Sequence, residues 1–287
     1  MDGDNFIYAY YQGIKNGSIT VGRWVRLLYE YLVAGLEKKE FFFDQERANA
    51  VIKWAETHWF HTEGHLAPGH ITLELWQKAM LSAMFGIVDA DGYRQFREVL
   101  LVVARKNGKS LLASGIGNYV FRVEGGYGAK VFCLAPKLEQ ADLCYSALEF
   151  NVNAEPELQA ITKSTKYRGL VIKETNTTVR KLAFTAKKSD GYNPMFYCAD
   201  EVAAWPGEKG LRQWEVMASG TGAREEPLGM AISSGGYENE GIFDELMKRG
   251  TGFLMGNSRE QHILPILYMI DDPEKWDDIN ELRKSNP

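Results

Sequence analysis

The sequence of 287 residues has few cysteines, no long hydrophobic run and no excess of positive charge. Its three cysteines, Cys133, Cys144 and Cys198, are far apart in the chain, which argues against a disulfide framework and against a cysteine zinc site. No apolar run approaches the roughly 18 residues that a membrane-spanning helix needs, and the acidic, aromatic start MDGDNFIYAYYQ is unlike a signal peptide. We therefore expect an intracellular soluble protein with small buried thiols.

The charge balance is slightly acidic, with 33 basic residues, 38 acidic residues and a net charge of −5. A surface that attracts nucleic acid all over is thereby excluded, and any polyanion must bind at a local basic patch. Four of the five histidines, His58, His61, His65 and His70, crowd one short stretch. Their spacing fits no closed zinc pattern and no cysteine is near, so we predict loop histidines rather than a metal site.

Two kinds of hydrophobic pattern divide the chain. The first part contains amphipathic helix patterns at residues 8–17, 21–39 and 47–60, followed by a loop rich in glycine, proline and histidine. From residue 97 onward, short apolar runs typical of buried strands alternate with longer helical patterns. This alternation predicts an α/β protein with a mainly parallel sheet that helices cover on both faces.

The same patterns predict three parts: a helical N-terminal region or lid at 1–72, an α/β core at 73–265, and an acidic, polar linker at 266–287. The predicted strands are residues 97–104, 129–136, 169–175, 179–186, 195–200 and 227–235.

The stretch VLLVVARKNGKSLL, residues 99–112, joins a predicted strand to a predicted helix. Backbone N–H groups at the start of a helix are unpaired and favour phosphate. Gly108 would let the backbone approach the phosphates, Lys109 would bridge the β- and γ-phosphates, and Ser110 would hold Mg²⁺. The usual pattern G-x-x-x-x-G-K-[ST] is incomplete, because Val103 stands at its first glycine. We predict a nucleotide-binding loop, and the alternative is a basic turn between two buried segments.

A second apolar run, MFYCADE at residues 195–201, ends in two carboxylates. In a parallel sheet the carboxyl end of a strand lies beside such a loop. Asp200 could therefore hold Mg²⁺ through water, and Glu201 could orient and polarise an attacking water. The alternative is an Asp-Glu pair that caps the following turn.

Two further patterns are weaker. AISSGGYEN, residues 231–239, places Ser233 and Ser234 at a strand end, where they could sense the γ-phosphate, but an ordinary strand-to-helix turn explains them equally well. In LELWQKAML the amide of Gln77 could read the edge of adenine. A surface glutamine on an amphipathic helix is the commoner explanation.

Together, VARKNGKS, MFYCADE, SSGG and the upstream LWQ resemble the ATPase motor of the large terminase subunit of tailed bacteriophages, in the branch with a VARKNGKS-type loop. Members of that branch replace the first glycine of the loop and carry an arginine within it, so Val103 and Arg105 fit the resemblance. The likeness extends over most of residues 5–287. It implies an ASCE-type P-loop NTPase core with a helical N-terminal region.

The resemblance also implies a role for each matching residue, with ATP and Mg²⁺ as cofactors. The ATP-binding set is the loop with the adenine-side glutamine: Gln77, Arg105, Lys106, Asn107, Gly108, Lys109 and Ser110. The catalytic set is Glu201, Arg105 and Lys109, the Mg²⁺ ligands are Ser110 and Asp200, and the coupling motif is Ser233, Ser234 and Gly235. Arg105 would contact the γ-phosphate and couple its state to subunit motion.

The implied function is an ATP-hydrolysing motor that translocates double-stranded DNA into a procapsid, in the host cytoplasm and transiently at the procapsid portal. Expected partners are DNA of any sequence, the portal and the small terminase subunit. Further copies of the chain would form a ring, expected to be a pentamer, whereas the isolated domain could be a monomer. A neighbour's arginine would neutralise charge on the γ-phosphate, and the candidates are Arg180, Arg212 and Arg224. Candidate DNA phosphate contacts are Lys163, Lys166, Arg168, Lys173, Lys187 and Lys188.

Members of this family usually continue into an RNase H-like nuclease domain. The chain ends near where that domain would begin, so residues 266–287 would be a linker toward an absent nuclease domain, in an isolated motor domain or a truncated gene product. No nuclease activity is expected from this chain. Two alternatives stay open: a helicase-like or other P-loop DNA-dependent ATPase unrelated to packaging, and a nucleotide-binding assembly module that does not hydrolyse.

Overall fold

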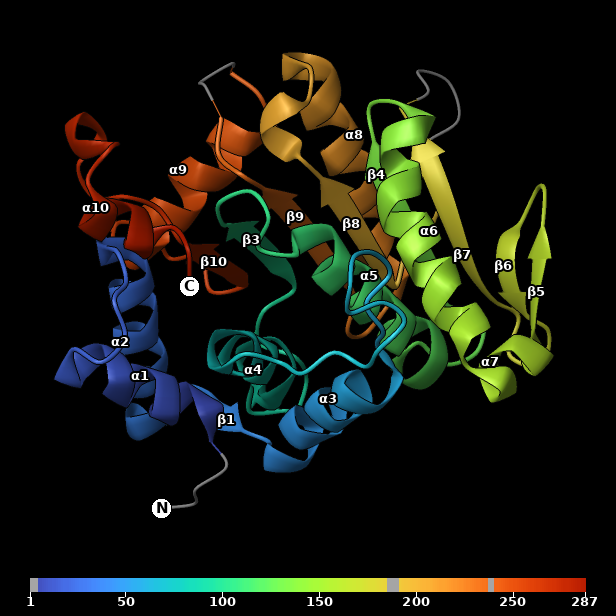
Figure 1. The fold of residues 1–287 in the computed structure, drawn as a ribbon, viewed down its shortest axis with the longest axis horizontal. Helices are drawn as coiled ribbons and strands as arrows, with labels where there is room; N and C mark the ends of the chain where they lie inside the picture. The colour runs from blue at the N-terminus through green and yellow to red at the C-terminus, as the bar shows by residue number, and fades with distance from the viewer. Residues whose placement is uncertain (1–4, 185–190, 237–239) are drawn as a thin grey trace. The chain divides into compact units, whose positions relative to one another are not determined.

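The computed structural model describes residues 5–184, 191–236 and 240–287 (Figure 1), so Lys187 and Lys188 lie outside the described residues. In the described part, no helix combines the length and the apolar composition that crossing a membrane requires. The α-helices are α1 (Phe6–Asn16), α2 (Arg23–Lys38), α3 (Gln45–His58), α4 (Leu75–Leu81), α5 (Lys109–Tyr119), α6 (Leu138–Ala154), α7 (Pro156–Ile161), α8 (Gly207–Ser219), α9 (Ile242–Leu254) and α10 (Ile279–Lys284). The strands are β1 (Phe42–Phe43), β2 (Ile87–Val88), β3 (Glu98–Val102), β4 (Lys130–Ala135), β5 (Thr162–Thr165), β6 (Gly169–Ile172), β7 (Thr177–Ala183), β8 (Phe196–Asp200), β9 (Leu228–Ser233) and β10 (Ile263–Leu267).

The elements form two compact units, each built from several stretches of sequence. Unit 1 contains the residues up to Lys53, Thr72–Asn107 and Leu246–Pro287. Unit 2 contains Trp54–Ile71 and Gly108–Glu245. The division of the sequence at residues 72 and 265 stays a prediction.

The N-terminal helices follow their predicted patterns. α1 begins behind Asn5, whose side chain accepts hydrogen bonds from the backbone N–H groups of Ile7 and Tyr8. It ends at Gly17, where a φ of 79° suits glycine. α1 packs against α2 and α4, and Tyr10 on its inner face is almost completely buried. The three helices predicted before residue 60 are therefore confirmed.

Unit 1 contains a parallel pair of strands, with Ile263 of β10 opposite Glu98 of β3 and Leu267 opposite Val102. The sequence analysis does not predict β10, because Pro265 interrupts the run ILPIL and proline is rare within strands. At the edge of a sheet the missing N–H of proline costs no ladder hydrogen bond, and β10 is an edge strand.

Six strands form the sheet of unit 2, in the order β9-β8-β4-β7-β6-β5. β9, β8, β4 and β7 are parallel, which confirms the mainly parallel sheet. The antiparallel part lies at one end, where β6 is antiparallel to β7 and β5 is antiparallel to β6. The connection between β6 and β7 spans only residues 173–176, and a parallel connection would need a dozen or more. β5 and α7 are further elements that the sequence analysis does not predict.

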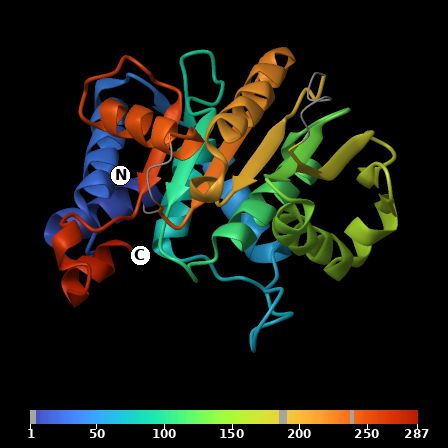
Figure 2. The same cartoon turned by 90° about the horizontal axis from the view of Figure 1, so that it is seen from above.

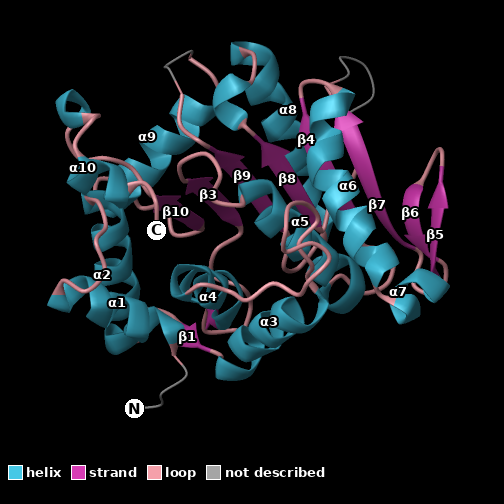
Figure 3. Cartoon of the chain, in the orientation of Figure 1, coloured by secondary structure: helices cyan, strands magenta, loops and turns pink. Residues whose placement is uncertain are grey.

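Helices cover both faces of this sheet. Successive side chains of a strand point to opposite faces, and the two aromatic residues that begin β8 meet different helices. Phe196 packs near Gly117 of α5, whereas the ring of Tyr197 lies 5.1 Å from that of Trp214 of α8. α6 lies along β4 and β7 on the α5 side, as Figure 3 shows. The observed layers agree with the predicted α/β class.

The three cysteines lie close together in the core of unit 2, on β4, β8 and α6. Cys133 of β4 is the register partner of Cys198 of β8, and Cys144 lies on α6. All three are buried and free, which confirms the prediction of small buried thiols.

The C-terminal segment, expected to be a linker, is folded onto unit 1. Lys284 of α10 forms an ion pair of 3.0 Å with Asp271. The carbonyl of Ser285 accepts a hydrogen bond of 3.1 Å from the backbone N–H of Ala104, directly after β3. The acidic composition alone does not predict a folded segment. In the structure, its carboxylates bind Lys284 and backbone N–H groups rather than solvent alone.

Gly115 of α5 tests the packing of unit 2. A Cβ atom added there would lie 2.4 Å from the ring of Trp59, which is 1% exposed and cannot move aside. We expect Gly115→Ala to lower the free energy of unfolding by about 1–3 kcal/mol, the usual cost of overpacking.

The matched control is Gly252→Ala in α9, where an added Cβ meets nothing within 4 Å. It should raise the free energy of unfolding by about 0.5–1 kcal/mol through helix propensity. Urea unfolding followed by circular dichroism measures both variants, and equal effects would contradict the packing argument.

Candidate active site

The predicted phosphate loop links β3 to α5. Lys106 and Gly108 both have a φ of 71°, in the left-handed region. A Cβ at Gly108 would meet nothing within 4 Å, so this glycine is favoured by its backbone conformation rather than by lack of space. Gly108 is the N-cap of α5 and supplies no side-chain cap. The first N–H groups of α5 are therefore available to an anion.

Asn107 fixes the part of the loop that belongs to unit 1. Its Nδ2 donates hydrogen bonds to the carbonyl of Ala104, at 3.1 Å, and to Oδ1 of Asn286, at 2.9 Å. The neighbouring side chains of Arg105 and Lys106 are exposed. The loop thus has one anchored amide between cationic side chains that reach into solvent.

The second half of the loop meets the end of β8 in unit 2. Ser110 donates a hydrogen bond of 2.9 Å from Oγ to Oδ2 of Asp200. Nζ of the buried Lys109 lies 3.7 Å from Oε1 of Glu201. The structure therefore brings together four side chains that the sequence analysis selected from two stretches about ninety residues apart.

Asp200 is a buried carboxylate, and one of its two oxygens has no hydrogen-bond partner among the described residues. Burial raises its pKa to about 6, and the charge of Glu201 adds to the rise, whereas the hydrogen bond from Ser110 lowers it. Oδ1 of Asp200 is buried and has no hydrogen-bond partner among the described residues. A hard divalent cation bound by this oxygen and by the hydroxyl of Ser110 would compensate the burial, so the donor set fits Mg²⁺.

Glu201 adopts the left-handed conformation, with φ 47° and ψ 53°, directly after β8. Its carboxylate accepts hydrogen bonds from the backbone N–H of Ser234, at 3.2 Å, and from Oγ of Ser234, at 3.0 Å and 3.2 Å. Oγ of Ser233 lies within 3.4 Å of the same carboxylate. β8 and β9 are neighbours, so their adjacent ends place both serines on Glu201. A conformation that is unfavourable for glutamate is held by several donors, as is common at functional sites.

Trp205 is a structural member of the site that the sequence analysis missed. Its ring is buried, and its Nε1 donates a hydrogen bond of 2.8 Å to the backbone carbonyl of Asp200. A tryptophan after a strand and a short turn gives no sequence signal for such a contact.

Gln77 has a structural role at the start of α4. Its Oε1 accepts a hydrogen bond of 2.9 Å from the backbone N–H of Glu74, and the Glu74 side chain accepts one from the backbone of Gln77. This capping box stabilises the start of α4. Gln77 as a reader of adenine stays a prediction.

The three candidate arginines differ in their surroundings. Arg180 lies on β7 opposite Phe132 of β4, and Arg212 is exposed on α8. The guanidinium of Arg224 donates to the carbonyl of Gly128 at 2.7 Å and to Oδ1 of Asn193 at 3.1 Å, before the amino ends of β4 and β8.

Two of the four clustered histidines pack on aromatic rings, and one of these, His58, is the last residue of α3 rather than a loop residue as predicted. His58 lies 4.0 Å from the ring of Trp54, and His70 lies 4.4 Å from that of Phe60, between ring centroids. These contacts agree with the structural role expected for them.

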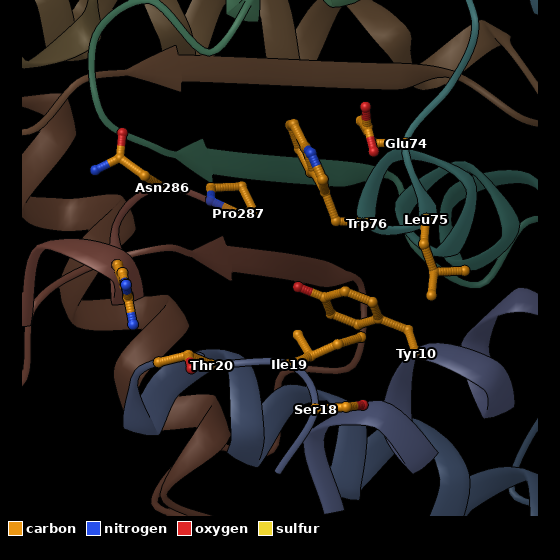
Figure 4. A pocket seen from close by; sticks show the side chains of 10 residues that line it. Tyr10, Ser18, Ile19, Thr20, Glu74, Leu75, Trp76, Asn286 and Pro287 are labelled. Carbon is orange, nitrogen blue, oxygen red and sulfur yellow. The ribbon is translucent and has the colours of Figure 1, made fainter. Parts of the chain in front are cut away.

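Unit 1 contains a pocket of about 300 Å³, one of whose lining residues, Asn286, contacts the part of the loop that belongs to unit 1. Figure 4 shows the rings of Tyr10 and Trp76 on one side, with Asn286 on another. Tyr268 fixes both rings, through a hydrogen bond of 3.0 Å between the hydroxyls of Tyr10 and Tyr268 and an edge contact with Trp76. Asn286 is also the partner of Asn107. The pocket thus presents aromatic walls next to the part of the loop that belongs to unit 1.

Trp205 provides a test of how the end of β8 is held. Trp205→Phe keeps an aromatic ring but leaves the carbonyl of Asp200 without its donor, so the free energy of unfolding should fall by about 1–3 kcal/mol. The control is Trp276→Phe, whose side chain is largely exposed and whose effect should stay within about 0.5 kcal/mol. Chemical denaturation followed by far-UV circular dichroism compares them, and similar losses would contradict the assigned role.

The chain is similar to known terminases. A model of the family described as "Terminase large subunit, ATPase domain" matches residues 75–251. The terminase large subunit of Lactococcus phage p2 is 24% identical over 279 residues, which cover 92% of this chain and 49% of that protein. The large terminase subunit of Enterobacteria phage HK97 is 26% identical over 190 residues, which cover 66% of this chain and 36% of that protein. The chain thus spans about half the length, or less, of these relatives.

The fold is also that of a solved terminase. The crystal structure of the HK97 bacteriophage large terminase matches with a TM-score of 0.66 and 22% identity, over 83% of this chain and 47% of that chain. This likeness confirms the predicted fold class. The family match covers more than half of the chain and includes the phosphate loop, Asp200, Glu201, Ser233 and Ser234. The chain therefore belongs to the family of terminase large subunit ATPase domains.

Proposed function

We propose that this chain binds ATP and Mg²⁺ and hydrolyses ATP to move double-stranded DNA into a procapsid in the infected host cell. The observation that carries the proposal is the meeting of Lys109, Ser110, Asp200 and Glu201 at the start of α5. Membership in the terminase family supports the step from ATP hydrolysis to DNA. The partners that this function requires are the portal, the small terminase subunit and further copies of the chain in a ring.

The phosphates would lie over the N-terminus of α5. The backbone N–H groups that follow Gly108 point toward that position, and the ammonium of Lys109 would leave Glu201 to neutralise the β- and γ-phosphates. The exposed guanidinium of Arg105 is available to the γ-phosphate.

Mg²⁺ would be held by the hydroxyl of Ser110 and, directly or through water, by Asp200. When bound, the ion supplies positive charge that stabilises the transferring phosphoryl group. The chain's part is to keep Asp200 ionised despite its burial, through the hydrogen bond from Ser110, and to keep the end of β8 in place through Trp205.

Glu201 would orient the attacking water and accept its proton. In the present structure its carboxylate receives donors from Ser234 and Ser233 and faces Lys109. These donors occupy the oxygen lone pairs that would otherwise accept a proton from the water. Activation therefore requires that some of these donors move, which would link the geometry of the β9 end to hydrolysis.

An arginine from a neighbouring subunit would complete the site. Arg212 is the best placed of the three candidates, because it is exposed on α8, whereas Arg224 is bound by the carbonyl of Gly128 and by Asn193. An isolated subunit would then turn over ATP slowly.

The assignment is tested by separating nucleotide binding from turnover. Glu201→Gln keeps an acceptor for Ser234 but removes the base, so ATP turnover should fall about 10²–10⁴-fold while ATP affinity stays near that of the wild type. Lys109→Ala should weaken ATP binding itself. Phosphate release and binding of a fluorescent ATP analogue measure the two properties.

The control for charge is Glu208→Gln, an exposed carboxylate on α8, which should leave both properties unchanged. Turnover in Glu201→Gln equal to that of the wild type would contradict the catalytic role. A wild-type protein that binds ATP without Mg²⁺-dependent phosphate release would instead be a non-hydrolysing module.

Ser234 tests the link between the two strand ends. Ser234→Ala removes the hydroxyl that bonds both oxygens of Glu201, so ATP hydrolysis should lose its dependence on DNA while staying within about tenfold of the basal rate of the wild type. Ser234→Thr keeps the hydroxyl and should keep the dependence. Normal stimulation of Ser234→Ala by DNA would show that the contact does not couple the two.

A further inference from the structure

One hairpin of unit 2 has a charge opposite to that of the chain as a whole. The sequence KSTKYRGLVIK, residues 163–173, contains four basic residues and no acidic one, in a protein with a net charge of −5. It forms β5, a turn and β6. Figures 1 and 2 show this hairpin at the end of the unit 2 sheet, beyond β7.

The four basic side chains, Lys163, Lys166, Arg168 and Lys173, are exposed. None of them forms an ion pair with a carboxylate in residues 5–184, 191–236 and 240–287. The guanidinium of Arg168 donates instead to the neutral side chain of Asn176, at 2.6 Å.

The neighbouring acidic side chains interact with groups other than the four cations. Glu149 accepts a hydrogen bond from Ser164. Glu174 and Glu157 act electrostatically on Arg122, whose pKa is lowered by burial and raised by these two charges. Among the described residues, the four cations of the hairpin therefore have no carboxylate within ion-pair distance.

Two of the lysines face each other. Lys163 is opposite Val171 in the ladder, so Lys173, two residues further on and directly after β6, is its diagonal neighbour on the same face of the hairpin. The close Lys163 side chain and the repulsion of its charge lower the pKa of Lys173. A phosphate between the two ammonium groups would remove this repulsion.

We propose that the β5–β6 hairpin contacts the phosphates of double-stranded DNA, with Lys163 and Lys173 on one face and Lys166 and Arg168 at the turn. The inference rests on the proposed function, which requires a polyanion held without regard to sequence. Duplex DNA offers one negative charge per about 1.7 Å of its axis, a density that four clustered cations can match. Tyr167, between the two turn cations and 83% exposed, adds a hydroxyl that can donate to a phosphate.

A different explanation accounts for part of the pattern. Lysines on an edge strand prevent strands of other molecules from pairing with it, and β5 is an edge strand. That explanation covers Lys163 but not Lys166 and Arg168, which lie in the turn, or Lys173, which follows β6.

The test compares two variants that lose the same charge. Lys163→Gln/Lys173→Gln removes the facing pair of the hairpin, and Lys15→Gln/Lys209→Gln removes two exposed lysines elsewhere. Affinity for blunt duplexes of two unrelated sequences is measured by fluorescence anisotropy over a series of salt concentrations. Each phosphate contact contributes about 0.9 to the slope of log affinity against log salt, so the hairpin variant should lose close to 2 from that slope with both duplexes, and the control should lose nothing.

The inference is overturned if the two variants lose the same affinity, if neither does, or if the loss depends on the DNA sequence. It is also overturned if the hairpin variant binds DNA normally but aggregates, which would assign the lysines to edge protection, or if RNA displaces the duplex from the wild type more strongly than DNA does. ATP turnover without DNA is measured on the same samples and should be unchanged, because the hairpin contributes no residue to the ATP site. A wild type without ATP turnover would refute the proposed function, whereas intact turnover with unchanged DNA binding would refute this inference alone.

Discussion

The hydrogen bond from Ser110 to Asp200 is the contact on which the site depends. It joins the first turn of α5 to the last residue of β8, so the anion-binding end of a helix and a buried carboxylate share one position. Asp200 is costly to bury, as its raised pKa shows, and the hydroxyl of Ser110 offsets part of that cost. The remaining oxygen stays without a partner. A site that is stable alone yet still short of one positive charge is suited to bind a nucleotide with its cation.

Glu201 depends on the neighbouring strand in the same way. Its left-handed backbone turns the chain sharply at the end of β8, and Ser234 at the end of β9 holds its carboxylate. The two strands are parallel neighbours, so a small shift of one relative to the other changes the hydrogen bonds of Glu201. This arrangement gives a physical route between the state of the phosphates and the segment after β9.

The charge distribution separates the two proposed tasks. The ATP site combines carboxylates with Lys109 and is nearly balanced, whereas the β5–β6 hairpin is purely basic within an acidic chain. Because the chain as a whole has a net charge of −5, a local basic hairpin can direct where a duplex makes contact without a basic protein overall.

The sequence by itself determined the α/β class, the position of the loop before α5, and the identity of Asp200 and Glu201, because short apolar runs that end in polar residues report strand ends directly. Only the tertiary structure decided which donors hold Glu201, since β8 and β9 become neighbours only when the sheet forms. It also decided that Pro265 lies in an edge strand and that the acidic C-terminal segment is folded as part of unit 1, with Ser285 hydrogen-bonded to Ala104. Local patterns describe what a segment prefers in isolation, but edge position, buried hydrogen bonds and charge pairing depend on partners distant in the sequence.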